Sequence, residues 1–135
     1  IFYQNPFGAA VASSINPMLI NVFPELAYDS WVTIGLDAPA NTGAGEGATN
    51  TAGNSWIAAF ESGSNIDISD AIGGGWYALG GDVNAVAGDD YRVLLGQFTT
   101  DGELGGSLQV QIFENGLTNE RKFPHEIFMD LYHKR

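Results

Sequence analysis

Alternation of apolar and polar side chains along the first 116 residues predicts a series of strands. In YDSWVTIGLD (28–37), the apolar side chains of Val32, Ile34 and Leu36 fall on one face and polar side chains on the other. Such a period of two is typical of a half-buried strand. The same reasoning predicts further strands over 55–62, 65–68, 74–79, 91–100 and 107–115.

The segments between the predicted strands are rich in glycine and other turn residues. NTGAGEGATNTAGN (41–54) has no large apolar side chain and predicts a long loop, of the kind that carries function or is covered by a partner. Nearer the start, Asn16 and Pro17 predict a single helical turn over 17–21, with Asn16 as its cap. After Pro24 the chain is expected to run extended into the next strand.

Residues 117–135 differ in kind from the rest, because most of the basic side chains lie there. Pro124 is well placed to begin a helix, and the side chains after it are apolar at helical spacing and basic at the end. We expect a short amphipathic C-terminal helix here, with an edge strand as the alternative. The apolar positions are Ile127, Phe128, Leu131 and Tyr132.

Together these patterns predict an all-β fold. We expect an antiparallel β-sandwich, with a jelly-roll-like arrangement as the alternative, followed by a short C-terminal helix or tail. The predicted organisation is a single β-sandwich domain over residues 1–116 and a basic, amphipathic tail over 117–135.

The excess of acidic side chains limits the kinds of partner that the protein is expected to bind. Sixteen acidic residues against five basic ones give a net charge of −11, and Arg92 is the only base before Glu120. Affinity for phosphate backbones comes from Lys and Arg, so nucleic acid is not an expected partner. No apolar stretch approaches the roughly 18 residues that a membrane span needs.

Composition also bears on the compartment. The chain has no cysteine, which excludes disulfides, zinc–thiolate sites and thiol nucleophiles. It has no lysine before Lys122 and is rich in small polar residues, as secreted and cell-surface proteins often are. Because the first residue is Ile1 rather than Met, the chain is expected to have been processed or cut from something longer. The expected location is extracellular or on the cell surface.

A resemblance supports this expectation. FPELAYDSWVTIGL, GGGWYAL and RVLLGQFTTDGELGGSLQVQIFENG follow one another in the chain. This order resembles a set of uncharacterised secreted all-β domains of marine and surface-associated microbes, over roughly residues 20–116. The resemblance implies a secreted β-sandwich and brings no activity with it. The basic tail departs from it.

One loop offers possible calcium ligands. Asp82, Asn84, Asp89 and Asp90 supply oxygen atoms within a short stretch, and calcium takes such ligands on flexible loops. The EF-hand pattern is not met, because valines stand at two of its ligand positions. The alternative is a solvated turn in an acidic protein. Apart from calcium, no cofactor is expected.

Aromatic side chains could bind a sugar. Trp31, Trp76 and Tyr77 are candidates for rings that stack on the apolar face of a glycan, as is Trp56. The alternative is that these rings fill the core, which we expect for at least two of the three tryptophans.

Catalytic patterns are weak throughout. A nucleophilic serine would need a base, and only His125 and His133 are available, both in the tail. No Gly-x-Ser-x-Gly elbow is present, and the glycine-rich stretches lack the Lys-Ser/Thr of a P-loop. Many pairs of carboxylates exist, and spacing selects none of them for glycoside hydrolysis. We do not expect an enzyme.

The first residues predict assembly. Ile1, Phe2, Tyr3 and Phe7 are apolar, and an extended segment of this kind can complete the sheet edge of a neighbouring copy. The alternative is an ordinary first strand within its own domain. We therefore expect a secreted structural module that forms a homo-oligomer, filament or matrix by strand addition. The alternative function is a carbohydrate-binding module, with or without calcium.

Overall fold

The computed structural model describes residues 1–116 and 121–122. The chain divides into two compact units, Ile1–Leu104 and Gly105–Arg135, and each is described by itself. The predicted C-terminal helix after Pro124 lies outside the described residues. None of the described helices is long and apolar enough to cross a membrane.

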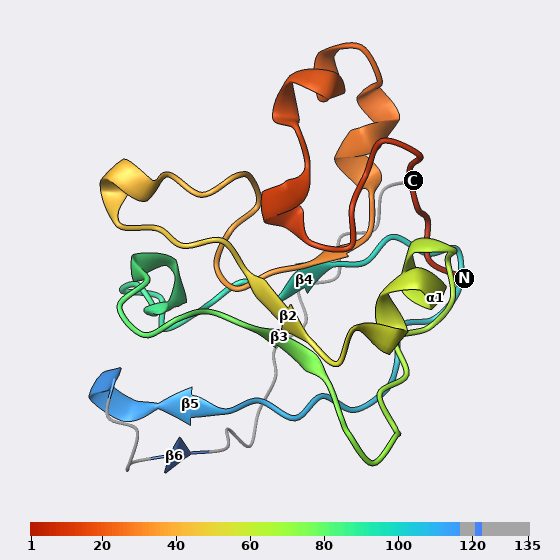
Figure 1. Cartoon of the computed structure of the whole chain (residues 1–135). Helices are drawn as coiled ribbons and strands as arrows, with labels where there is room; N and C mark the ends of the chain where they lie inside the picture. The colour runs from red at the N-terminus through yellow and green to blue at the C-terminus, as the bar shows by residue number, and fades with distance from the viewer. Residues whose placement is uncertain (117–120, 123–135) are drawn as a thin grey trace. The chain divides into compact units, whose positions relative to one another are not determined.

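The first unit contains two small antiparallel sheets. β1 (Trp31–Val32) pairs with β4 (Gly96–Gln97), and β2 (Asn50–Ala52) pairs with β3 (Gly75–Tyr77), as Figure 1 shows for β2 and β3. One short helix, α1 (Ile57–Glu61), and a series of 3-10 turns complete it. These turns are Ala12–Ser14, Pro17–Asn21, Pro24–Tyr28, Thr42–Ala44, Asn54–Trp56 and Val83–Ala85.

The antiparallel pairing of strands is as predicted. The described chain is nevertheless mostly irregular, and its regular elements are a mixture of short strands, one helix and 3-10 turns. The described residues contain no closed sandwich. Of the strand expected over 28–37, only β1 forms, and residues 29–33 are all buried instead of alternating. Residues 65–68 form no strand, and 91–100 contribute only β4.

The prediction of a strand over 55–62 is wrong. Asn54–Trp56 forms a 3-10 turn that continues into α1. Trp56 and Phe60 are four residues apart, so a helix places both on one face, and both are buried. Ala58 and Ala59 between them favour a helix as well.

Prolines determine two other turns. The predicted turn over 17–21 is confirmed, because the side chain of Asn16 accepts a hydrogen bond from the N–H of Met18 at 3.0 Å. The prediction of extended chain after Pro24 is wrong, since Pro24 begins a second 3-10 turn that ends at Tyr28. A proline at the first position suits either turn because its φ is already helical.

The loop expected over 41–54 contains a strand, β2, that pairs with β3. Glycines allow the two chains to approach closely at this point. A Cβ on Gly53 would overlap the carbonyl of Gly73, and a Cβ on Gly74 would lie 2.8 Å from the carbonyl oxygen of Gly53. Side chains at these positions would therefore push the backbones apart.

The second unit contains one described pair of strands. β5 (Ile112–Phe113) pairs antiparallel with β6 (Arg121–Lys122). The strand predicted over 107–115 is confirmed only at these two residues.

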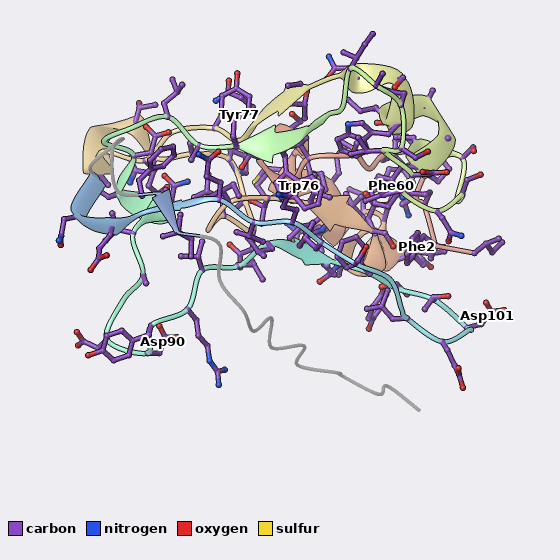
Figure 2. All side chains as sticks on the ribbon, turned by 90° about the horizontal axis from the view of Figure 1, so that it is seen from below. Phe2, Phe60, Trp76, Tyr77, Asp90 and Asp101 are labelled. Atoms are coloured by element: carbon purple, nitrogen blue, oxygen red, sulfur yellow. The ribbon has the colours of Figure 1, made fainter. Side chains whose placement is uncertain are left out.

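Aromatic rings dominate the core of the first unit. Phe60 is fully buried and contacts Phe2, Trp56 and Phe98, with ring centroids 5.8, 6.1 and 6.2 Å away. Figure 2 shows Phe2 and Phe60 close together. Val32 and Ala10 are buried in the same cluster. The core therefore joins the start of the chain to α1 and to the segment after β4.

We predict that Phe60→Ala lowers the free energy of unfolding by about 3–5 kcal/mol, because it removes the ring at the centre of this cluster. Ile72→Ala is the matched control, since Ile72 is 93% exposed and its loss should change stability by less than about 0.5 kcal/mol. Urea denaturation measures both. Equal destabilisation by the two variants would contradict this description of the core.

Candidate assembly site

Residues 1–10, called here the leading segment, lie against three other parts of the first unit. In Figure 1 the start of the chain passes beside α1. We call the surface that receives the segment the slot, made of residues 29–32, 60–63 and 98–100. The leading segment carries no charged side chain.

Main-chain hydrogen bonds hold the leading segment along the slot. The N–H of Phe2 donates to the carbonyl of Gly63 at 2.9 Å, and that of Tyr3 donates to the carbonyl of Thr99 at 2.7 Å. Phe2 also forms an antiparallel bridge with Thr100. The bridge to Thr100 is antiparallel, as between neighbouring strands, and the bond to Gly63 ties the segment to the residues that follow α1.

The contacts continue beyond Tyr3. The N–H of Ser30 donates to the carbonyl of Tyr3 at 3.1 Å, and the N–H of Val32 donates to the carbonyl of Ala10 at 2.8 Å. The hydroxyl of Thr100 donates to the carbonyl of Ile1 at 2.9 Å. Both ends of the segment are therefore bonded to the slot.

Phe2 is the main apolar anchor. Its ring contacts Phe60 edge to face and Phe98 at a centroid distance of 5.4 Å. Ile1, by contrast, is 89% exposed. The leading segment thus supplies one ring of the aromatic core.

Two carboxylates of the slot bind the middle of the segment. Asp29 is fully buried and accepts from the N–H of Asn5 at 2.7 Å and from the N–H of Ala9 at 3.1 Å. Glu61 accepts from the N–H of Ala10 at 3.1 Å. Neither residue was predicted as a site residue, because Asp29 fell on the polar face of one predicted strand and Glu61 near the end of another.

A turn in the leading segment brings these N–H groups to Asp29. Asn5-Pro6-Phe7-Gly8 places Asn, Pro and Gly where a type I turn favours them. The N–H of Gly8 donates to the carbonyl of Asn5 at 2.9 Å, and the side chain of Asn5 accepts from the N–H of Phe7 at 2.9 Å. This Asn-Pro-x-Gly pattern was the available sequence signal for the turn.

Burial raises the pKa of the Asp29 carboxyl above its ordinary value of 3.8. Removal from water is the largest cause, and the negative charge of Glu61 adds to it. The backbone N–H groups of Asn5, Ala9 and Ser30 act in the opposite direction without overcoming the loss of water. The ionised carboxylate is therefore less stable in the slot than in water.

The fit between segment and slot is incomplete. A cavity of about 210 Å³ is lined by residues of both, including Gln4, Pro6 and Glu61. The buried Nε2 of Gln4 has no hydrogen-bond partner among the described residues. An unpaired buried donor costs about 1–3 kcal/mol. The segment is thus held less tightly than a fully paired strand.

The four residues predicted to mediate assembly all lie in the leading segment, but they differ in exposure. Phe2 packs in the core, whereas Tyr3 is 38% and Phe7 is 47% exposed. Phe7 stacks on Phe23 at a centroid distance of 4.1 Å. Within this single chain the segment fills its own slot, and exchange between copies stays a prediction.

Asp82, Asn84 and Asp90, three of the four residues predicted to bind calcium, form hydrogen bonds within the described part of the chain. The Asn84 amide donates to the carbonyls of Ile34 and Gly47 at 2.7 and 3.1 Å, and its oxygen accepts from the N–H of Gly47 at 3.0 Å. Asp82 accepts from the N–H of Leu79 at 3.0 Å. Asn84 therefore holds two loops together.

Asp89 and Asp90 are both exposed, and Asp90 accepts from the N–H of Arg92 at 3.1 Å. Figure 2 shows Asp90 on a loop that extends away from Trp76. Within the described part of the chain, no three His, Cys, Asp or Glu side chains form a group that could hold a metal ion. Calcium binding stays a prediction.

Three of the four ring candidates for glycan binding are packed, and Tyr77 is the exception. Trp31 is only 7% exposed, and Trp76 packs against the core and donates its Nε1–H to the carbonyl of Thr33 at 3.0 Å. Tyr77, the next residue of β3, is 46% exposed. Burial of Trp31 and Trp56 confirms that at least two tryptophans belong to the interior.

Comparisons of the chain with models of protein families, with curated proteins and with solved structures gave no match. The function proposed below therefore rests on the chain's own residues.

We predict that Asn84→Ala destabilises the fold by about 1–3 kcal/mol, because it leaves the carbonyls of Ile34 and Gly47 unpaired. Asp89→Ala is the control and should have little effect, since that side chain is exposed. Thermal unfolding of the wild type and of both variants, measured in calcium and in a chelator, tests calcium binding on the same samples. A calcium-dependent rise in Tm that Asp89→Ala abolishes would show that Asp89 is a calcium ligand and not only an exposed, solvated side chain.

A second prediction concerns pH. Because the pKa of Asp29 is raised in the folded state, this group contributes most to stability below 3.8, and that contribution is lost as pH rises through the folded-state pKa. The stability of the wild type relative to Asp29→Asn should therefore fall between pH ~3 and pH ~7. Urea denaturation across this range measures the difference. A wild type that gains stability over Asp29→Asn with rising pH would reverse the sign and contradict the assignment.

Proposed function

We propose that this protein is a non-catalytic structural module that assembles with copies of itself, the leading segment of one copy filling the slot of the next. The observation that carries the proposal is the way the segment is held. Its backbone is bonded along its length to residues 29–32, 61–63 and 99–100, and Phe2 supplies a ring of the core. The same bonds can form between two copies, because none of them depends on the chain connection.

Repetition of the contact determines the kind of assembly. A segment that leaves one copy and enters another makes a head-to-tail contact, which need not close on itself. The product is a filament or an open matrix, in which each inner copy both donates a segment and accepts one. Exchange within a pair would give a closed dimer instead.

Apolar side chains elsewhere in the first unit support association. Met18 and Val22 are 70% and 67% exposed on and beside the turn Pro17–Asn21. Large exposed apolar side chains that lie close together often mark contact surfaces. From residue 1 to residue 28 the chain carries one charge, that of Glu25, although the whole chain has a net charge of −11. Copies of this acidic protein meet with least repulsion through such a region.

The proposed location is extracellular or on the cell surface, on the grounds of composition. Nucleic acid is not proposed as a partner, because the first unit has Arg92 as its single base. For the fold we propose that the short antiparallel pairs belong to a β-sandwich that added strands complete. A filament would then supply the pairing that each single copy lacks.

Carbohydrate binding is the second candidate, and one observation favours it. Tyr77 presents an exposed ring on β3, next to Trp76, whose ring is fixed by its hydrogen bond to Thr33. A glycan that stacks on Tyr77 would lose binding in a Tyr77→Ala variant. Glycan-array binding that survives this change would remove Tyr77 from the proposal.

Particle size tests the assembly function. We expect the full chain to form particles larger than a monomer. Deletion of residues 1–8 should give monomers once a peptide of residues 1–8 is added to fill the vacated slot and restore the core contacts of Phe2. Light scattering after size-exclusion chromatography measures the mass. A truncated chain that still forms the same filament would exclude the leading segment as the connector.

A pair of point variants sharpens this test. In a mixture of wild type and Phe2→Ala, the slot of a wild-type copy should take the Phe2→Ala segment about tenfold to a hundredfold less often than the native one, because a buried aromatic side chain contributes about 1.5–3 kcal/mol. Ile1→Ala is the matched control, since Ile1 is adjacent and 89% exposed. Equal effects of the two variants would show that Phe2 is not the anchor.

A further inference from the structure

The slot places a strict steric requirement on one position of the segment that fills it. Gly8 lies directly over the Asp29 carboxylate, and a Cβ at this position would overlap Cγ and both oxygens of Asp29. The φ of Gly8 is outside the left-handed region, so the requirement is one of space and not of backbone conformation. Any side chain here, even that of alanine, therefore collides with the slot.

Hydrogen bonds hold Asp29 in the position that Gly8 faces. Its two carboxylate oxygens accept from Asn5 and Ala9, and its own carbonyl accepts from the side chain of Gln97 at 2.7 Å. Its side chain is fully buried, so a displaced carboxylate would lose these backbone N–H groups without gaining contact with water in their place. A Cβ at position 8 would break the hydrogen bonds on either side.

The turn makes this requirement specific to a sequence. Asn5 and Ala9 reach one carboxylate only because the turn from Asn5 to Gly8 brings their N–H groups together. Pro6 at the second position of the turn fixes its φ in advance. Phe2 then enters the ring cluster of Phe60 and Phe98 at a fixed distance along the segment.

We propose that the slot selects the segment of a second copy by a short sequence code: phenylalanine at position 2, the Asn-Pro turn at positions 5 and 6, and glycine at position 8. This inference rests on the proposed exchange of the leading segment and specifies what the slot accepts. The partner is a second copy of this chain, because an unrelated apolar peptide lacks the glycine that Asp29 demands. Phe2 supplies affinity, and Gly8 supplies discrimination.

The carboxylates of the slot bind uncharged backbone N–H groups, which supports a second copy of this chain as the partner. Asp29 and Glu61 accept peptide N–H groups, and the segment that presents them carries no charge of its own. An acidic peptide would add like charge beside a carboxylate that is already desolvated, which is unfavourable. The slot therefore disfavours an acidic segment and accepts a segment without acidic side chains, such as the one this chain carries.

Peptide competition with the intact protein tests the code. A fluorescent peptide of residues 1–10 is added while the full chain refolds from denaturant, and its binding is measured by anisotropy. Four peptides are compared: the native sequence, Gly8→Ala, Phe2→Ala and the control Ile1→Ala. We expect the native and Ile1→Ala peptides to bind and to shorten the assemblies, and expect Gly8→Ala and Phe2→Ala to lose at least about tenfold in affinity.

The outcomes separate this inference from the proposed function. Light scattering on the same samples without peptide reports whether the full chain assembles. If it assembles and the Gly8→Ala peptide competes as well as the native one, the code is wrong while segment exchange stands. If the full chain remains a monomer and no peptide binds, exchange fails and the code fails with it.

Discussion

The buried carboxylate of Asp29 is the interaction on which the first unit depends. It receives two N–H groups of the leading segment, while its own N–H donates to the carbonyl of Leu26 at 3.1 Å and its carbonyl accepts from Gln97. One residue thus ties the start of the chain to the turn Pro24–Tyr28 and to β4. Since backbone N–H groups offset its charge, the leading segment must be in place for Asp29 to be buried. Displacement of the segment would return the carboxylate to water.

The burial of Asp29 explains why the leading segment can be exchanged although many hydrogen bonds hold it in the slot. The raised pKa of Asp29 means that burying its ionised form is unfavourable, and that cost opposes the main-chain bonds and the ring of Phe2. The unpaired Nε2 of Gln4 and the cavity beside it oppose docking as well. Exchange remakes the same contacts on another copy and so changes the free energy little, while these opposing terms favour release of the segment from its own slot. Strand exchange needs this balance.

The sequence predicted what is local and missed what depends on tertiary contacts. The turn at Pro17 was predictable because Asn16 caps it from the adjacent position. The helix at Trp56–Phe60 was missed because six apolar or small residues in a row fit a strand as well as a helix, and only burial of both rings selects the helix. Irregular backbone around β1 and β4 could not be predicted, because hydrogen bonds from distant residues such as Thr99 replace a regular ladder there.

The candidate site shows the same division. Phe2 was selected by its apolar character, and the Asn-Pro-x-Gly turn was legible as a pattern. Asp29 was not, because a polar residue in an alternating stretch is expected to face solvent, and nothing local marks it as an acceptor for N–H groups twenty or more positions away. The same limit applies to Asn84, whose role as a clamp depends on loops distant in sequence.

Cross-linking between two single-cysteine variants tests the central claim of segment exchange most directly. The native chain has no cysteine, and the carbonyl of Ile1 lies 2.9 Å from the hydroxyl of Thr100, so Ile1→Cys and Thr100→Cys place one thiol on each side of the contact. The two variants are refolded as a mixture and treated with a short thiol-specific cross-linker. Exchange predicts a covalent dimer that contains one chain of each variant. Cross-links that form only when both cysteines are in the same chain would contradict it.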